Sequence, residues 1–169
     1  MEHFNRIVFT EKKFQESLKF VCIQFGVVNL YEEQINALRA FLIGKHVYFS
    51  AHTGYGKSLI FQCLPILIDF YNNTPLYSTM IVISPLKLLM EDQVNTLANY
   101  GISAIAVHSD LDENAVKEFI ENVKEHNLYS IIYVSPEKIL SEAWIEICKI
   151  LQRTCVGVAI DEAHCIPMW

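Results

Sequence analysis

The stretch HVYFSAHTGYGKS, residues 46–58, decides the fold class of this chain. Its first part, His46 to Ala51, is a short run rich in apolar and β-forming residues, which is typical of a strand. A turn with two glycines, Gly54 and Gly56, follows, and an apolar run with helical periodicity begins at Lys57. We therefore predict a strand, a glycine-rich turn and a helix in direct succession.

The rest of the chain repeats this alternation of strand and helix. The strands predicted besides 46–51 are Thr79–Ser84, Ser103–His108, Ser130–Val134 and Val156–Asp161. The predicted helices are Thr10–Gln24, Tyr31–Ile43, Lys57–Tyr71, Leu86–Tyr100, Leu111–Glu125 and Pro136–Leu151. Nearly continuous Val and Ile runs suit strands that are covered on both faces. The alternation predicts an α/β fold with a mostly parallel sheet and right-handed crossovers.

Length and composition limit the classes of protein that the chain can represent. At 169 residues it is one domain, or one domain that lacks a piece. Hydrophobic residues make up 52% of it, which is enough for a buried core and excludes general disorder. The net charge of −6 argues against strong, salt-driven binding to nucleic acid, although it leaves room for a few phosphate contacts.

The sequence also indicates an intracellular protein without a membrane span. Charged residues interrupt every long apolar stretch, and the first fourteen residues contain no secretory hydrophobic segment. The five cysteines form no C-x-x-C pair and are odd in number, which fits a reducing compartment and core packing.

The glycine-rich turn has the residues that phosphate binding requires. Gly54 and Gly56 permit backbone conformations that direct successive N–H groups inward, and the start of a helix adds positive potential. Lys57 would reach the terminal phosphates of a nucleotide, and the Ser58 hydroxyl would ligate Mg²⁺. Thr53 and Tyr55 complete the expected phosphate-binding loop. The alternative is an ordinary glycine turn that caps a helix.

A pair of carboxylates follows the last predicted strand. Asp161 and Glu162 stand at the carboxyl end of the run Val156 to Ile160, which is where parallel sheets bind ligands. We expect Asp161 to hold Mg²⁺ and Glu162 to orient and deprotonate the attacking water. The alternative is two carboxylates that merely solvate a strand end.

These motifs, with the residues around them, resemble the first motor domain of the RecQ family of superfamily-two DNA helicases. The resemblance covers residues 25–169. It rests on five segments in order, namely Phe25-Gly26 with Gln34, the loop and helix from Gly54 to Pro65, Ser84 to Val94, Tyr133 to Glu137, and Asp161 to Ile166. It implies a three-layer RecA-like P-loop domain that binds ATP and Mg²⁺ and contacts DNA at a junction of single and double strands.

The resemblance also assigns roles to further residues. Gln34 would read the adenine edge with its amide, and Tyr31, which stands where the family has an arginine, would stack on the base. His164 would couple the nucleotide state to DNA movement. The residues that would contact nucleic acid are Ser84, Pro85, Lys87, Ser135 and Trp169.

The family pattern divides the chain into a helical segment, residues 1–24, and a RecA-like domain, residues 25–169, that is truncated at its carboxyl end. The second motor domain of the family, which carries the arginine fingers, is not in this sequence. We therefore expect weak binding of nucleotide and DNA without unwinding, whereas the complete form would unwind DNA in the 3′-to-5′ direction, in a nucleus or a nucleoid. Two alternatives stay open: a non-catalytic module that binds ATP or DNA, and an unrelated P-loop ATPase.

Overall fold

The computed structural model of the chain describes residues 9–74, 77–126 and 129–168. The chain forms two compact units, Met1–Pro75 and Leu76–Trp169, and each is described by itself. The described helices of the first unit are α1 (Glu11–Gln24), α2 (Glu32–Leu42) and α3 (Lys57–Asn72). The described elements of the second unit are β1 (Thr79–Ile83), α4 (Lys87–Asn99), β2 (Ala104–Val107), α5 (Glu113–His126), β3 (Ile131–Val134), α6 (Pro136–Ile139), α7 (Glu142–Leu151), β4 (Cys155–Ile160) and the 3₁₀ helix η1 (Ala163–Met168).

In the first unit, α1 packs against α3 through one apolar face. Phe14, Leu18 and Val21 recur at helical spacing and are buried, because positions three and four apart fall on the same side of a helix. Helix α3 buries more of its circumference, including Cys63 and Leu67. The amino-terminal helix is therefore part of the same compact unit as α3, and the predicted domain boundary after residue 24 stays a prediction.

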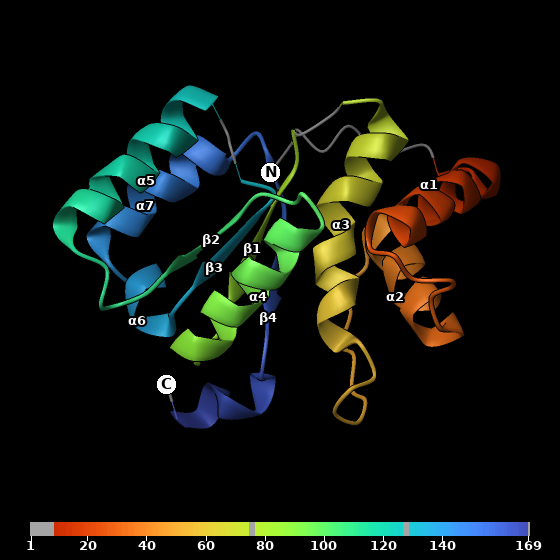
Figure 1. Ribbon diagram of the computed structural model, residues 1–169, viewed down its shortest axis with the longest axis horizontal. Coiled ribbons are helices and arrows are strands. Elements are labelled where there is room, and N and C mark those ends of the chain that lie inside the picture. Colours follow the sequence, from red (N-terminus) through yellow and green to blue (C-terminus); the bar gives the residue numbers. More distant parts are fainter. Residues whose placement is uncertain (1–8, 75–76, 127–128, 169) are drawn as a thin grey trace. The chain divides into compact units, whose positions relative to one another are not determined.

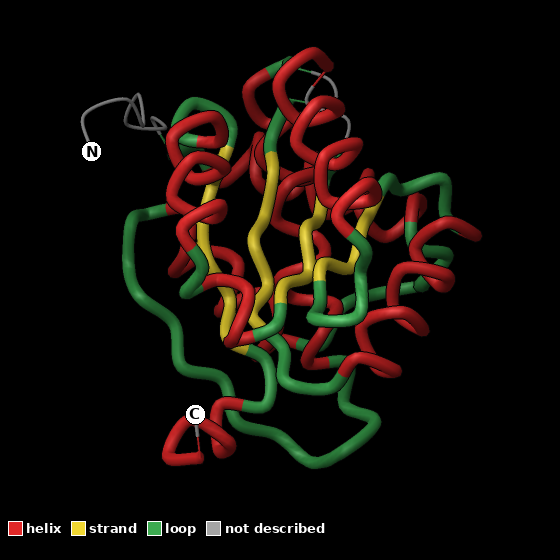
Figure 2. The backbone as a smooth tube through the Cα atoms, turned by 90° about the vertical axis from the view of Figure 1, so that its left-hand side faces the viewer, coloured by secondary structure: helices red, strands yellow, loops and turns green. Residues whose placement is uncertain are grey.

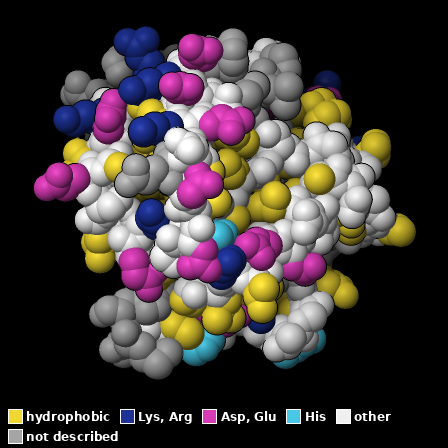
Figure 3. Space-filling view, turned by 60° about the vertical axis from the view of Figure 1, so that its left-hand side comes forward, with side chains coloured by type: hydrophobic (Ala, Val, Ile, Leu, Met, Phe, Trp, Pro, Cys, Tyr) yellow, Lys and Arg dark blue, Asp and Glu magenta, His cyan; other side chains and the backbone are white. Residues whose placement is uncertain are grey.

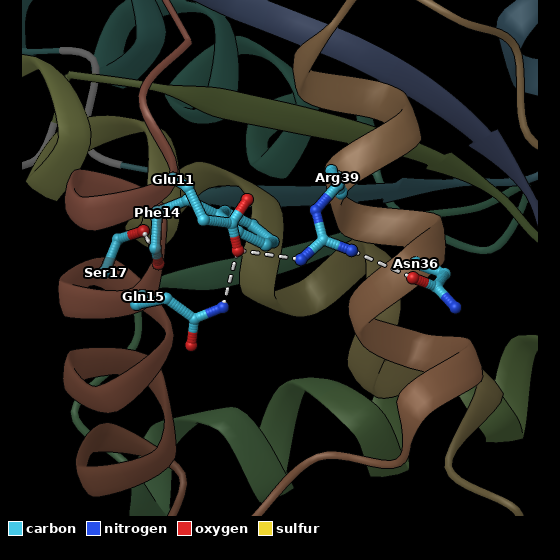
Figure 4. A network of polar contacts seen from close by, with 6 residues as sticks. All are labelled: Glu11, Phe14, Gln15, Ser17, Asn36 and Arg39. Carbon is cyan, nitrogen blue, oxygen red and sulfur yellow. Dashed lines mark hydrogen bonds and ion pairs between the residues drawn. The ribbon is translucent and has the colours of Figure 1, made fainter.

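Polar contacts join α1 to α2 (Figure 4). The Arg39 guanidinium of α2 donates to Glu11 Oε1 at 2.9 Å and to Asn36 Oδ1 at 2.9 Å. The same guanidinium carbon lies 5.1 Å from the centre of the Phe14 ring, within range of a cation–π contact. These contacts hold α2 beside α1.

The second unit is built on a parallel sheet, as the sequence predicts. Its four strands lie in the order β2-β3-β1-β4, and all three pairings are parallel (Figures 1 and 2). The register aligns Ile83 of β1 with Val134 of β3 and with Ile160 of β4. Because parallel strands run the same way, their carboxyl ends meet at one edge of the sheet.

Helices cover both faces of this sheet. Figure 1 shows α5 and α7 on one face and α4 on the other. On the α5 and α7 side, Ile81, Ile132 and Val134 pack with Phe119 and Trp144 into the main core cluster. On the opposite face the Tyr133 hydroxyl donates to Gln93 Oε1 of α4 at 2.7 Å. The α/β fold class with a parallel sheet is therefore confirmed.

Two predicted elements differ from the structure. Residues 46–51 do not form a strand, and Val47 and Tyr48 are exposed. An apolar run becomes a strand only when a neighbouring strand accepts its hydrogen bonds, and this segment joins no ladder among the described residues. The predicted helix 136–151 is divided into α6 and α7, because Ser141 donates its hydroxyl to the Lys138 carbonyl at 2.6 Å and leaves the helical conformation with ψ at 152°.

Within residues 9–74, 77–126 and 129–168, no helix is both long and apolar enough to cross a membrane.

The central strand β3 supplies a stability test. We predict that Ile132→Ala, at a side chain with 0% exposure, lowers the free energy of unfolding by about 2–5 kcal/mol because it leaves a cavity in the core. Ile145→Ala in α7, at 59% exposure, is the matched control and changes it by no more than about 0.5 kcal/mol. Urea unfolding of the two variants measures the difference; equal losses would contradict the assigned core.

Candidate functional site

The glycine-rich loop before α3 has the backbone shape of a phosphate cradle. Gly54 and Gly56 adopt φ of +84° and +79°, in the left-handed region that other residues avoid. Helix α3 begins directly after Gly56, which occupies the N-cap and has no side chain to satisfy the first N–H groups of the helix. The loop therefore combines glycines, a helix amino terminus and, at the second position of α3, the Ser58 hydroxyl. Thr53 and Gly54 are exposed.

Lys57 lies across this loop. Its ammonium donates to the carbonyl oxygens of Ala51 at 3.0 Å and His52 at 3.1 Å. These bonds hold the lysine where the loop turns, with the charged end next to the residues that precede the glycines. An anion that entered the loop would meet this ammonium, so the arrangement fits the predicted role of Lys57.

Gln34 connects α2 to the same loop. Its side chain is 3% exposed, and Nε2 donates to the carbonyls of Tyr55 and Gly56 at 3.1 Å each. Its Oε1 accepts the backbone N–H of Tyr31 at 2.9 Å, at the start of α2. A Cβ atom on Gly56 would lie 2.8 Å from Nε2, so a side chain at position 56 would displace this amide from its present place. The predicted reading of adenine by Gln34 stays a prediction; in the structure its amide braces the loop.

Two tyrosines and a glutamate adjoin the loop. The rings of Tyr31 and Tyr55 stack with centroids 4.7 Å apart and planes at 26°. The Tyr55 hydroxyl donates to Glu33 Oε2 at 2.6 Å. This hydrogen bond raises the pKa of Tyr55 to about 12 and lowers the pKa of Glu33, since it favours the neutral phenol and the ionised carboxylate. Tyr31 is 59% exposed, so its ring is accessible to a ligand.

In the second unit, buried polar residues follow each strand at the carboxyl edge of the sheet. In the spatial order of the strands they are His108, Ser135, Ser84 and Asp161. Their backbones continue the ladder, because Ser84 N donates to Val134 O and Asp161 N to Ile83 O. The parallel sheet thus brings together residues that are up to 77 positions apart in the chain, from Ser84 to Asp161.

The predicted nucleic-acid contacts at this edge have different surroundings. Ser84 is 1% exposed, and its Oγ has no hydrogen-bond partner among the described residues. Ser135 Oγ accepts Lys138 N at 3.4 Å and caps α6. Buried polar groups without partners are rare, so the Ser84 hydroxyl is a candidate ligand group. Pro85 follows it at partial exposure, and Trp169 lies outside the described residues.

Lys87, the predicted cationic contact, is already paired with carboxylates. Its Nζ lies 2.6 Å from Asp110 Oδ2 and 3.9 Å from Glu91 Oε1. The hydrogen bond between Lys87 and Asp110 raises the pKa of Lys87 and lowers the pKa of Asp110. His108 Nε2 lies 3.3 Å from the same Glu91. Figure 3 shows acidic and basic side chains interspersed on the face that it displays, in keeping with the acidic balance of the chain.

Asp161 and Glu162 form a tight turn after β4. Asp161 Oδ1 accepts the Glu162 N–H at 3.0 Å, and the Asp161 side chain is buried. Glu162 has φ of +50°, an uncommon conformation for a residue with a Cβ that costs of order 1–3 kcal/mol and clusters at functional sites. His164 Nδ1 lies 3.2 Å from Glu162 Oε2, and the His164 side chain is exposed. The predicted coupling residue thus touches the predicted base.

Each predicted group is therefore assembled within its own unit. Tyr31, Gln34 and the loop residues lie together in the first unit, and the sheet-edge residues and the carboxylates lie in the second. The described residues contain no group of three or more His, Cys, Asp or Glu side chains that could hold a metal. Oxygen ligands of the kind that Mg²⁺ prefers are present in Ser58 and Asp161.

Two residues of these groups are not among the site residues predicted from the sequence, in which His108 is only the end of a predicted strand. Glu33 and His108 lie in no motif of the family resemblance. Glu33 belongs to the first turn of α2, where acidic side chains are common beside the positive end of a helix, so its sequence position gave no separate signal. His108 directly follows β2 at the carboxyl edge, and that placement could have identified it once the sheet order was known.

Comparison with known proteins identifies the family of the chain. Residues 31–169 match the model of the DEAD/DEAH box helicase family. The chain is 36% identical to the ATP-dependent helicase wrn-1 of Caenorhabditis elegans over 92% of its length, 40% identical to the ATP-dependent DNA helicase RecQ of Bacillus subtilis over 69%, and 31% identical to the RecQ-like DNA helicase BLM of Xenopus laevis over 99%.

These matches span 14%, 18% and 12% of the three relatives, so the chain corresponds to a small part of each. The glycine loop with Lys57, the carboxyl-edge residues and the turn at Asp161 all fall inside the matched region. The chain belongs to the DEAD/DEAH box helicase family, and its relatives are RecQ-type ATP-dependent DNA helicases.

Proposed function

We propose that this chain is the ATP-binding half of a RecQ-type DNA helicase motor that works inside the cell on chromosomal DNA, in a nucleus or a nucleoid. The observation that carries the proposal is the loop before α3, in which two left-handed glycines flank Tyr55 and Lys57 lies across the turn. Family membership leaves the alternative of an unrelated P-loop ATPase without support.

The proposed binding step uses the loop and Lys57. Backbone N–H groups at the start of α3 donate hydrogen bonds to the phosphates, and the Lys57 ammonium exchanges its two carbonyl partners for phosphate oxygens. Ser58 and Asp161 are the proposed ligands of Mg²⁺, which when bound neutralises charge on the phosphates. Tyr31 stacks on the base, and Gln34 supports the loop and reads adenine.

The proposed hydrolytic step uses Glu162. Its carboxylate orients the attacking water and takes its proton, and Asp161, which accepts the Glu162 N–H, holds the turn that presents it. His164 contacts the Glu162 carboxylate, so a change in the protonation or hydrogen bonding of Glu162 would be felt by His164. In phosphoryl transfer an arginine finger can contribute about 10³–10⁵ in rate, so we propose that this chain by itself turns over very slowly and does not unwind DNA.

The proposed DNA contacts lie at the carboxyl edge of the sheet. Ser84 offers a hydroxyl that has no partner in the described part of the chain, Ser135 a hydroxyl at the start of α6, and Lys87 a cation that must first leave Asp110. Pro85 and Trp169 complete the proposed set. Such groups bind the phosphate backbone without reading its sequence. In the complete protein this contact would serve unwinding in the 3′-to-5′ direction.

Lys57→Ala tests the phosphate cradle. We predict that it weakens Mg-ATP binding at least about tenfold. The reason is that the variant removes the ammonium that donates to the loop carbonyls of Ala51 and His52 and would pair with the phosphates. Calorimetric titration of the 169-residue chain measures the affinity. Lys45→Ala, an exposed lysine in the same unit, is the control and keeps normal affinity. Normal affinity of Lys57→Ala would overturn the cradle assignment.

Turnover distinguishes a motor half from a non-catalytic module. We predict slow ATP hydrolysis by the chain alone that disappears in Glu162→Gln while Mg-ATP binding persists, because the substitution removes the base and keeps the shape. A phosphate-release assay at saturating ATP measures both proteins. Absence of any difference between them would favour the non-catalytic module.

Ser84→Ala tests the nucleic-acid edge. We predict about two- to fivefold weaker binding of single-stranded DNA, with unchanged Mg-ATP affinity, because one hydroxyl donor is lost. Ser103→Ala, an exposed serine just before β2 at the amino edge of the same sheet, is the control. Fluorescence anisotropy of a labelled oligonucleotide provides the comparison, and equal DNA binding by all three proteins would remove Ser84 from the interface.

A further inference from the structure

Tyr55 occupies a position where the backbone would otherwise be highly mobile. The glycines on both sides of it, Gly54 and Gly56, are in the left-handed region, and glycine has more conformational freedom than any other residue. A Gly-x-Gly segment loses this freedom when it closes on a ligand, and that loss opposes binding. Whatever holds Tyr55 in place before the ligand arrives reduces this cost.

Several contacts hold Tyr55, and three of them come from the N-cap and the first turn of α2. Its hydroxyl donates to Glu33 at 2.6 Å, its ring stacks on Tyr31, and its carbonyl accepts Gln34 Nε2 at 3.1 Å. Two aromatic residues of the preceding segment also contact the ring, His52 at 5.3 Å and Phe49 at 6.1 Å between centroids. The middle residue of the glycine turn is thus fixed by its hydroxyl, its ring and its backbone.

The negative charge of Glu33 shows that its contact with Tyr55 does not serve to attract phosphate. A carboxylate beside a loop that binds a polyanion disfavours that anion by simple repulsion, although solvent screening weakens the effect. Glu33 therefore does not act by attracting the phosphates. Its ionised carboxylate instead accepts a short hydrogen bond from the tyrosine of the loop, and charge-assisted bonds of this kind are stronger than neutral ones.

We propose that Glu33 and Tyr55 are positioning residues that preorganise the phosphate loop, so that nucleotide affinity depends on the hydrogen bond between them. This inference rests on the proposed function of the loop. The bond acts on the loop backbone, so its effect is the same for ATP and for a triphosphate without a base. At neutral pH a phenol is protonated and a carboxylate ionised. The hydrogen bond between Tyr55 and Glu33 moves both pKa values further from neutral pH, since it raises the pKa of Tyr55 to about 12 and lowers the pKa of Glu33.

Tyr55→Phe is the decisive variant, because it removes the hydroxyl, keeps the stacked ring and changes no charge. We expect binding of Mg-ATP and of magnesium with inorganic tripolyphosphate to weaken by the same factor, about three- to tenfold. Calorimetric titration of the 169-residue chain gives both affinities. Hydrogen exchange of the loop peptide should be faster than in the wild type without ligand, and thermal stability should stay unchanged.

Glu33 variants complete the test. Glu33→Ala should weaken both ligands, Glu33→Gln should recover part of the loss because its amide oxygen still accepts, and Glu33→Ala combined with Tyr55→Phe should be no weaker than the more severe single variant. Glu32→Gln is the matched control for charge, since Glu32 is an exposed neighbour in the same helical turn.

The possible outcomes separate this inference from the function on which it rests. Wild-type affinity of Tyr55→Phe for both ligands, or additive losses in the double variant, overturns the positioning role alone. A loss confined to ATP also overturns it and assigns Tyr55 to the base. Failure of the wild-type chain to bind either ligand overturns the proposed function and this inference together.

Discussion

The hydrogen bonds from Gln34 Nε2 to the carbonyls of Tyr55 and Gly56 are the constraint on which the first unit depends. They join α2 to the loop that precedes α3. At position 56 a Cβ would approach the amide to 2.8 Å and displace it, so the absence of a side chain there preserves these bonds. The loop therefore has its shape before any ligand is present. Preorganisation of this kind reduces the entropy that binding must overcome.

The second unit depends on a different constraint, the common direction of its strands. Because β1, β2, β3 and β4 run parallel, the residue after each strand lies at one edge. Four polar side chains are buried there. The Ser84 hydroxyl, which has no partner among the residues that the structure describes, and the left-handed Glu162 backbone are local costs that a stable fold retains only when other interactions compensate for them. Both costs occur at residues that the family resemblance assigns to function.

The lysine at each of the two proposed ligand sites already has partners within the protein. Lys57 donates to loop carbonyls, and Lys87 pairs with Asp110 and Glu91. Binding at either site is therefore an exchange of partners. For Lys57 the exchange replaces neutral carbonyls with phosphate charge, whereas for Lys87 it replaces one anion with another, so the first exchange is the more favourable. The net charge of −6 argues against strong, salt-driven binding to nucleic acid, and weak binding of DNA by this chain stays a prediction.

Except for the division of the predicted helix 136–151 into α6 and α7, the sequence by itself determined the order of helices and strands in the second unit, the parallel sheet and the family, because periodicity and motif spacing are local properties of the chain. It was wrong about residues 46–51, because a strand exists only where a neighbour pairs with it. Only the tertiary structure decided that Tyr55 bonds to Glu33, 22 positions away, and that Lys87 bonds to Asp110, 23 positions away. Such pairs depend on how turns direct separate elements toward each other, and no local pattern encodes that direction.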